Sequence, residues 1–140
     1  MENKFTLPSP EVQIKHSVFQ EKSVEVCLKR DDQIHSVVSG NKWRKLKYNV
    51  EKCRQEKYDG ILTFGGAYSN HLRATARVGK IFDVKTIGIV RGEELNEDSN
   101  PTLKACADDG MQLVFTPREE YALRDEKYYH EELRRRHGNF

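Results

Sequence analysis

The spacing of apolar residues predicts four strands after a polar beginning. Residues 23–29 alternate between apolar and polar positions, which is typical of a strand. Residues 61–64, 84–90 and 111–115 are short and mostly apolar, and such runs suit strands buried on both faces of a parallel sheet. Residues 1–22 contain closely spaced prolines and predict an extended lead-in, without a helix, that lies along another body of structure.

Helices are expected between these strands. An apolar stripe predicts a helix over residues 42–57, with Asn41 as its N-cap. A second is expected over residues 69–82, and its face toward the sheet carries the small or compact residues Leu72, Ala76 and Gly79.

Two further helices complete the pattern. One is expected over residues 100–110, because Asn-Pro opens it and glycine ends it. Residues 116–119 read as a capping box, which predicts a last helix running to about His137. The order β-α-β-α-β-α-β-α predicts an α/β fold, an open twisted parallel sheet with helices on both faces.

Composition narrows the function classes. The 140 residues suffice for one ordinary domain, and 36% hydrophobic with 33% charged residues indicates a globular protein. The 24 basic residues are interleaved with 22 acidic ones, for a net charge of +2, so no nucleic-acid partner is expected. No apolar run reaches the ~20 residues of a membrane span, and the first residues lack the apolar core of a secretory signal. We therefore expect a cytoplasmic protein.

Cysteine and histidine usage predicts no metal site. Cys27, Cys53 and Cys106 are far apart and show neither metal-ligand nor redox-motif spacing. Three reduced thiols are the expectation for a cytosolic chain. The histidines do not cluster with cysteines or carboxylates at ligand spacing.

Two junctions between a loop and a helix carry the candidate chemistry. Residues 39–46 read Ser-Gly-Asn-Lys-Trp-Arg-Lys-Leu, and residues 65–71 read Gly-Gly-Ala-Tyr-Ser-Asn-His. Lys42 stands at a predicted helix start, where the dipole disfavours a cation, and an uncharged amine is what attack on a carbonyl requires. The second junction combines glycines with a helix start suited to a carboxylate or phosphate. We expect the two to face each other, with Lys42 as the covalent anchor of a carbonyl cofactor.

Other interpretations of these junctions remain open. The glycine pair and serine also make a good turn and N-cap, and lysines near helix starts are commonly surface residues. A nucleotide-binding module is poorly supported, because the phosphate-binding Gly-x-Gly-x-x-Gly pattern is absent.

The chain resembles a known enzyme family at three motifs. Residues 29–32, 39–48 and 65–71 are similar, in order and spacing, to the N-terminal half of the 1-aminocyclopropane-1-carboxylate deaminase / D-cysteine desulfhydrase family. The similarity spans nearly the whole chain. The resemblance implies a tryptophan synthase β-like fold, pyridoxal 5'-phosphate as cofactor, and a deaminase or lyase acting on a small amino acid.

The resemblance also implies roles for individual residues. Lys42 would carry the cofactor covalently, Asn70 would bind its ring hydroxyl, and Asn41 would help to position it. Ser69 would assist proton transfer near the substrate Cα and carboxylate, and His71 would lie beside it at the substrate.

Family members continue well past residue 140. The resemblance therefore implies that residues 1–40 belong to a large domain, that residues 41–140 form a small α/β domain, and that the C-terminal half of the large domain is absent. Apolar surface should then be exposed, and a homo-oligomer is expected. A non-catalytic binding or interaction domain derived from this fold is the alternative. Ala67 and Tyr68 differ from the pair that the deaminases favour, which leaves the D-cysteine branch open.

Overall fold

The fold is built on a three-stranded parallel sheet, seen in a computed structural model that describes residues 4–140. The strands are β3 (Gly60–Gly65), β4 (Lys85–Arg91) and β5 (Gln112–Thr116), hydrogen-bonded in the order β3-β4-β5. Their segments are those in which the sequence predicts buried strands. Ile87, Ile89 and Val90 of the central strand are fully or almost fully buried.

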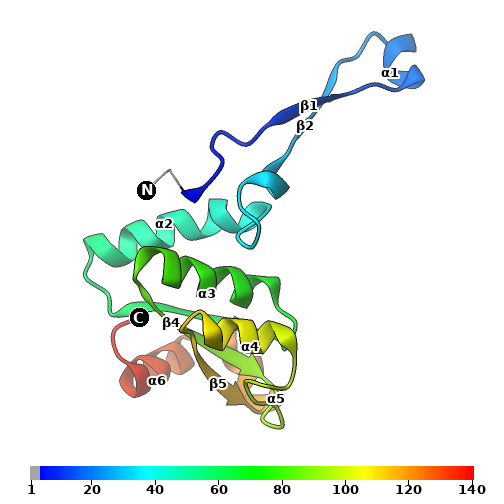
Figure 1. The fold of residues 1–140 in the computed structure, drawn as a ribbon. Coiled ribbons are helices and arrows are strands. Elements are labelled where there is room, and N and C mark those ends of the chain that lie inside the picture. Colours follow the sequence, from blue (N-terminus) through cyan, green and yellow to red (C-terminus); the bar gives the residue numbers. More distant parts are fainter. Residues whose placement is uncertain (1–3) are drawn as a thin grey trace.

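Helices cover both faces of this sheet. α2 (Asn41–Gln55), α3 (Asn70–Phe82) and α4 (Pro101–Asp108) lie on one side, and α5 (Arg118–Ala122) and α6 (Lys127–His137) on the other (Figure 1). The predicted α/β fold is confirmed. Within residues 4–140, no helix combines the length and the apolar character that crossing a membrane requires.

The core between α2 and α3 follows the predicted apolar stripe. Trp43, Leu46 and Val50 are buried there. The Trp43 ring lies between two phenylalanines, with its centroid 3.9 Å from that of Phe5 and 5.7 Å from that of Phe82. Because Phe5 precedes the first strand, its stacking attaches the N-terminal segment to the body of the protein.

α3 packs unusually close to the sheet at Gly79. A Cβ atom added at Gly79 would lie 2.6 Å from Thr86 Cγ2 and 2.7 Å from the carbonyl oxygen of Val84. No side chain fits at those distances unless helix and strand separate. α3 can therefore pack this close to the sheet only because its predicted small-residue face has a glycine at position 79.

The N-terminal segment differs from its prediction. β1 (Glu11–Ile14) pairs antiparallel with β2 (Val26–Lys29) in a separate two-stranded sheet, and α1 (Ser17–Glu21) joins them. The strand predicted at residues 23–29 thus exists but does not join the parallel sheet, and the lead-in does contain a helix. Figure 1 shows this arm projecting away from the body. Residues 1–3 of the predicted lead-in lie outside the described part.

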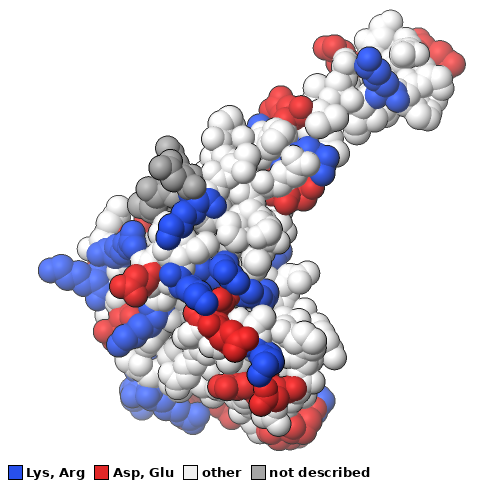
Figure 2. All heavy atoms as spheres, in the orientation of Figure 1, with Lys and Arg blue, Asp and Glu red and all other residues white. Residues whose placement is uncertain are grey.

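The arm has one apolar and one polar face. Val12 pairs with Leu28, and the next pair on the same face is also apolar. On the other face Lys29 Nζ lies 2.9 Å from Glu11 Oε1. Val12 is 47% exposed and Leu28 48%, and Figure 2 shows charged side chains of both signs along the arm with uncharged surface between them. An isolated two-stranded ribbon is marginally stable in water, so this face gains stability by being covered.

We expect the chain to self-associate through this face. The double substitution Val12→Lys and Leu28→Lys should shift the chain toward the monomer, because it puts two charges where a second copy would bury apolar surface. Light scattering over a concentration series checks this result. Lys29→Gln on the polar face is the control and should leave the mass distribution unchanged; a monomeric parent chain would contradict the expectation.

Helix boundaries show where local signals were misleading. Asn41 is the first residue of α2 and not its N-cap, a position that Gly40 occupies. The predicted capping box makes no capping hydrogen bond, and the last helix is interrupted by a 3-10 turn, η3 (Leu123–Asp125). Asn100 does cap α4, where its side-chain oxygen accepts the N–H groups of Thr102 and Leu103.

Candidate functional site

Lys42 stands in the first turn of α2, where its neighbour fixes its amine. Lys42 Nζ donates a hydrogen bond to Asn41 Oδ1 over 2.7 Å. Gly40 precedes them with a φ of +59°, a backbone conformation that favours glycine. The Asn41 side chain, expected to cap the helix, instead holds the lysine.

Asp31 anchors the loop before this turn. Its backbone oxygen accepts the Gly40 N–H over 2.8 Å, and its carboxylate accepts a hydrogen bond from Ser9 Oγ over 2.6 Å and pairs with Arg44. The hydrogen bonds from Arg44 and then Ser9 hold the pKa of Asp31 well below its usual range. Asp31 therefore ties the start of α2 to the N-terminal segment.

The second junction is fixed by a capping serine and a glycine. Ser69 Oγ accepts the N–H of Leu72 over 3.2 Å, which confirms the predicted N-cap of α3. A Cβ at Gly65 would lie 2.7 Å from Ser69 Oγ and 2.6 Å from Leu72 Cγ, so this cap requires glycine there. Asn70 is consequently the first residue of the helix.

The two helix starts meet at one open pocket of about 440 Å³. We call it the Lys42 pocket; its lining residues are Ser36, Val37, Ser39, Gly40, Asn41, Lys42, Asn70 and Arg73. The structure thus brings together three of the five predicted site residues, Asn41, Lys42 and Asn70. Ser69 and His71 flank Asn70 but are not part of the lining.

The composition of the lining indicates what can bind. It offers two cations and several polar side chains, and among the described residues no carboxylate. An amine held by an amide oxygen, beside a second positive charge, suits a carbonyl compound that carries an anionic group. In residues 4–140, no group of three or more histidines, cysteines or acidic residues could hold a metal ion.

Burial and two nearby lysines lower the pKa of His71, which follows Asn70 on α3. Burial lowers the pKa of His71 below its usual 6.5, and the charges of Lys42 and Lys45 lower it further. The imidazole is therefore neutral at pH 7. As the pH falls, His71 is protonated in the unfolded chain before it is protonated in the folded chain. The neutral His71 therefore costs no stability above about pH 6.5, and the free energy of unfolding decreases as the pH falls below that value.

Removing the Lys42 charge should move the His71 titration. We expect Lys42→Met to raise the pKa of His71 toward its ordinary value, because one of the two cations acting on the ring disappears. NMR titration of the imidazole signals measures the shift. Lys47→Met, which removes a charge elsewhere on α2, should leave His71 unchanged. An unaltered His71 titration in Lys42→Met would contradict the described placement.

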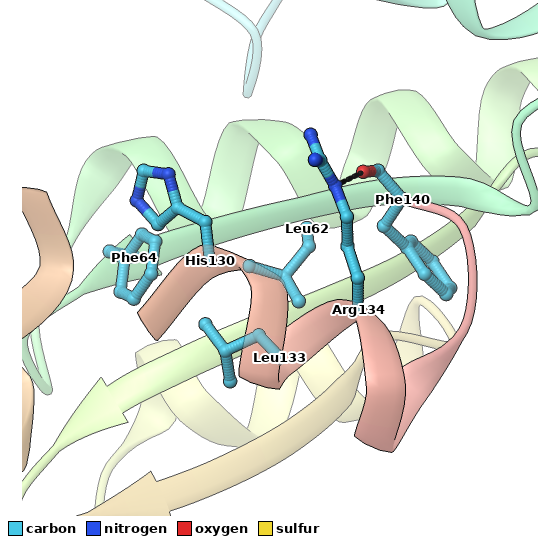
Figure 3. A pocket seen from close by; sticks show the side chains of 6 residues that line it. All are labelled: Leu62, Phe64, His130, Leu133, Arg134 and Phe140. Carbon is cyan, nitrogen blue, oxygen red and sulfur yellow. Dashed lines mark hydrogen bonds between the residues drawn. The ribbon is translucent and has the colours of Figure 1, made fainter. Parts of the chain in front are cut away.

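A second pocket lies on the other side of the sheet and is mainly apolar. Figure 3 shows Leu62 and Phe64 from β3 facing Leu133 of α6, with Phe140 beside them; its volume is about 150 Å³. Arg134 Nε donates to the Phe140 carbonyl oxygen over 3.4 Å. Because the side chains of this lining include no primary amine, the Lys42 pocket is the candidate site.

Comparison with known proteins gives the family. No protein-family model matches the chain. It is 33% identical over 132 residues to "Putative 1-aminocyclopropane-1-carboxylate deaminase" of Thermotoga maritima, a match that covers 94% of this chain and 41% of that protein. It is 37% identical over 79 residues to the mitochondrial bifunctional D-cysteine desulfhydrase/1-aminocyclopropane-1-carboxylate deaminase of Arabidopsis thaliana, covering 56% of this chain and 20% of that protein.

The structural comparison gives the fold. A crystal structure of an ACC deaminase homologue superposes with a TM-score of 0.70 at 24% identity, covering 98% of this chain and 41% of the other. The match covers about two fifths of the Thermotoga maritima protein and of the homologue of known structure, and a fifth of the Arabidopsis thaliana protein. By sequence the chain therefore matches the 1-aminocyclopropane-1-carboxylate deaminase / D-cysteine desulfhydrase family over that part of the family's length, and the structural comparison shows the same fold.

Proposed function

We propose that this chain carries the reactive lysine of a pyridoxal-phosphate-dependent deaminase or lyase that acts on a small amino acid of the 1-aminocyclopropane-1-carboxylate or D-cysteine class. The observation that supports it most is the Lys42 amine, hydrogen-bonded to Asn41 in a pocket that Asn70 also lines. The pocket's positive charge suits a cofactor that bears a phosphate and a substrate that bears a carboxylate.

Each residue has a task in this proposal. Lys42 would hold the cofactor through its amine, which would condense with the cofactor carbonyl with loss of water; Asn41 would orient that amine, and Asn70 would hold the cofactor ring. Once bound, pyridoxal phosphate withdraws electrons from the substrate Cα. The Ser69 oxygen already accepts the Leu72 N–H, so its own hydroxyl proton stays available for donation next to Asn70.

The experiment is direct labelling of the whole chain. Addition of pyridoxal phosphate should produce visible absorbance, and borohydride reduction followed by peptide mapping should place one label on Lys42. A label confined to any other lysine would refute the assignment. A folded chain that gives no spectral change at high cofactor concentration would favour the alternative, a non-catalytic binding or interaction domain.

The domain division and the location in the cell stay predictions. The assignment of residues 1–40 to a large domain and residues 41–140 to a small one agrees with the separate arm sheet but needs the rest of the fold to test it. Cytoplasmic location rests on the sequence alone.

A further inference from the structure

His35 lies in the loop between η2 (Asp31–Gln33) and α2, and its side chain folds back onto that loop. Its Nδ1 accepts the N–H of Val37 over 2.9 Å and the N–H of Val38 over 3.1 Å. Within residues 4–140 these two N–H groups have no other acceptor. Val38 is fully buried in the core, and Val37 lines the Lys42 pocket. One imidazole nitrogen therefore fixes the backbone between the core and the pocket.

The loop of residues 36–40 forms one side of the Lys42 pocket. It contributes four of the eight lining residues, namely Ser36, Val37, Ser39 and Gly40. At its far end the Gly40 N–H donates to the Asp31 backbone oxygen over 2.8 Å, whereas the middle of the loop is held by His35. The position of this side of the pocket therefore depends on His35, which does not itself line it.

The hydrogen bonds of His35 fix its protonation state. A ring nitrogen that accepts N–H groups carries no proton, so the imidazole is neutral and its proton is on Nε2. The imidazolium form has an N–H on both nitrogens. Protonation of Nδ1 would therefore place a donor against the N–H groups of Val37 and Val38 and break both hydrogen bonds.

The surroundings of the ring favour the neutral form near pH 7. Burial lowers the pKa of His35 below its usual 6.5, and the charge of Arg77 on α3 lowers it further. From the N-terminal segment, the Phe5 ring lies with its centroid 5.3 Å from that of His35. Both aspartates of η2 pair with arginines. The imidazole therefore takes up a proton only as the pH falls below about 6.5.

We propose that His35 positions the loop of residues 36–40 for cofactor binding at Lys42, and that protonation of its imidazole releases this loop. The inference rests on the proposed function, because the cofactor is the ligand that the positioned loop receives. A proton on Nδ1 leaves the N–H groups of Val37 and Val38 without an acceptor, so the loop leaves the position in which it lines the pocket. His35 is thus a positioning residue that acts through the backbone.

An NMR titration of the whole chain without cofactor tests the contact. Between about pH 8 and pH 5, the amide signals of Val37 and Val38 should shift with the same midpoint as the ring signals of His35, because one proton breaks both bonds. His35→Asn should abolish this shift, since an asparagine oxygen accepts nearby backbone N–H groups at every pH in this range. Amide signals that do not follow the His35 titration would overturn the proposal.

Labelling of Lys42 by pyridoxal phosphate and borohydride at pH 7 tests the consequence for the pocket. His35→Leu has no acceptor and should raise the cofactor concentration for half labelling about fivefold or more, the value of one lost hydrogen bond. His35→Asn should stay within about twofold of the parent chain. Equal labelling of His35→Leu and the parent chain would contradict the role of His35.

His16→Leu is the matched control. His16 Nδ1 accepts the N–H of Val18 over 3.3 Å, so the substitution removes the same kind of contact, but on the arm and not at the pocket. It should leave Lys42 labelling unchanged. If His35→Leu does not fold, the parent chain is compared with His35→Asn at about pH 5.5, where the parent should label less well than the variant; equal labelling there counts against the proposal.

The two measurements separate this inference from the proposed function. If the amide signals follow His35 but the parent chain is not labelled at Lys42, the loop contact is supported and the proposed function alone fails. If Lys42 is labelled equally with and without an acceptor at position 35, the role of His35 alone fails.

Discussion

Replacing Lys42 with alanine should abolish the covalent attachment of pyridoxal phosphate. We expect the parent chain to gain one cofactor mass after borohydride reduction and Lys42→Ala to gain none at this site, because no other primary amine lines the pocket among the described residues. Amines at the surface react too weakly to replace an amine held next to the bound cofactor. Intact-mass spectrometry before and after reduction measures the loss.

Lys45→Ala is the matched control for this experiment. Lys45 is exposed on the same helix and its charge reaches the same histidine, but it is not part of the pocket lining. It should keep full labelling at Lys42. Labelling of Lys42→Ala to the extent of the parent chain would show that the modified amine lies elsewhere.

Replacing Asp109, which pairs with Arg73, Arg77 and Lys80, with asparagine should lower the free energy of unfolding by about 3 kcal/mol, the lower end of the range for breaking a buried ion pair. The lower end applies because the partners Arg73 and Lys80 are 20% and 54% exposed, and water can hydrate them. Burial by itself raises the pKa of Asp109, but the hydrogen bonds from Arg73 and Lys80 outweigh it, and the pKa lies below its usual value. The stabilisation is therefore present at neutral pH and is lost under acid conditions, below about pH 4.

Urea denaturation of Asp109→Asn and Asp108→Asn checks this prediction. Asp108 is the exposed neighbour, so its substitution should change the free energy of unfolding by less than about 0.5 kcal/mol. A loss below about 1 kcal/mol for Asp109→Asn would mean that the ion pairs of Asp109 with Arg73, Arg77 and Lys80 do not stabilise the fold.

The strands and helices of the sheet could be predicted because their signals are local. The buried stripe from Trp43 to Cys53 recurs at helical spacing, and the apolar run of residues 61–64 is the centre of β3. These patterns depend only on which face of each element is covered. The same reasoning located Lys42 and Asn70 at helix starts, where they do meet at one pocket.

The arm shows what local patterns cannot give. Alternation in residues 23–29 predicts a strand but not its partner, and the partner β1 (Glu11–Ile14) lies in a segment whose prolines suggested an extended lead-in. The pairing of β1 with β2 requires the chain to reverse direction through α1, and no periodic pattern of apolar residues predicts that reversal. The strand was therefore assigned to the wrong sheet.

Arg73 was missed for a related reason. An arginine on a helix reads as a solvated charge, and the residue that holds it, Asp109, is 36 positions away. Asp31 likewise contacts Ser9 and Arg44, which lie 22 and 13 positions from it. Contacts at such separations appear only once the helices are packed.

Gly79 influences the geometry of the Lys42 pocket because it has no side chain. The C-terminal end of α3 sits against Thr86 at a distance that no Cβ permits, and the N-terminal end of the same rigid helix carries Asn70. Even Gly79→Ala would require helix and strand to move apart at that contact, and a movement of the helix would change the distance between Asn70 and Lys42. The geometry of the Lys42 pocket can therefore be changed by residues that do not line it, through the inclination of one helix.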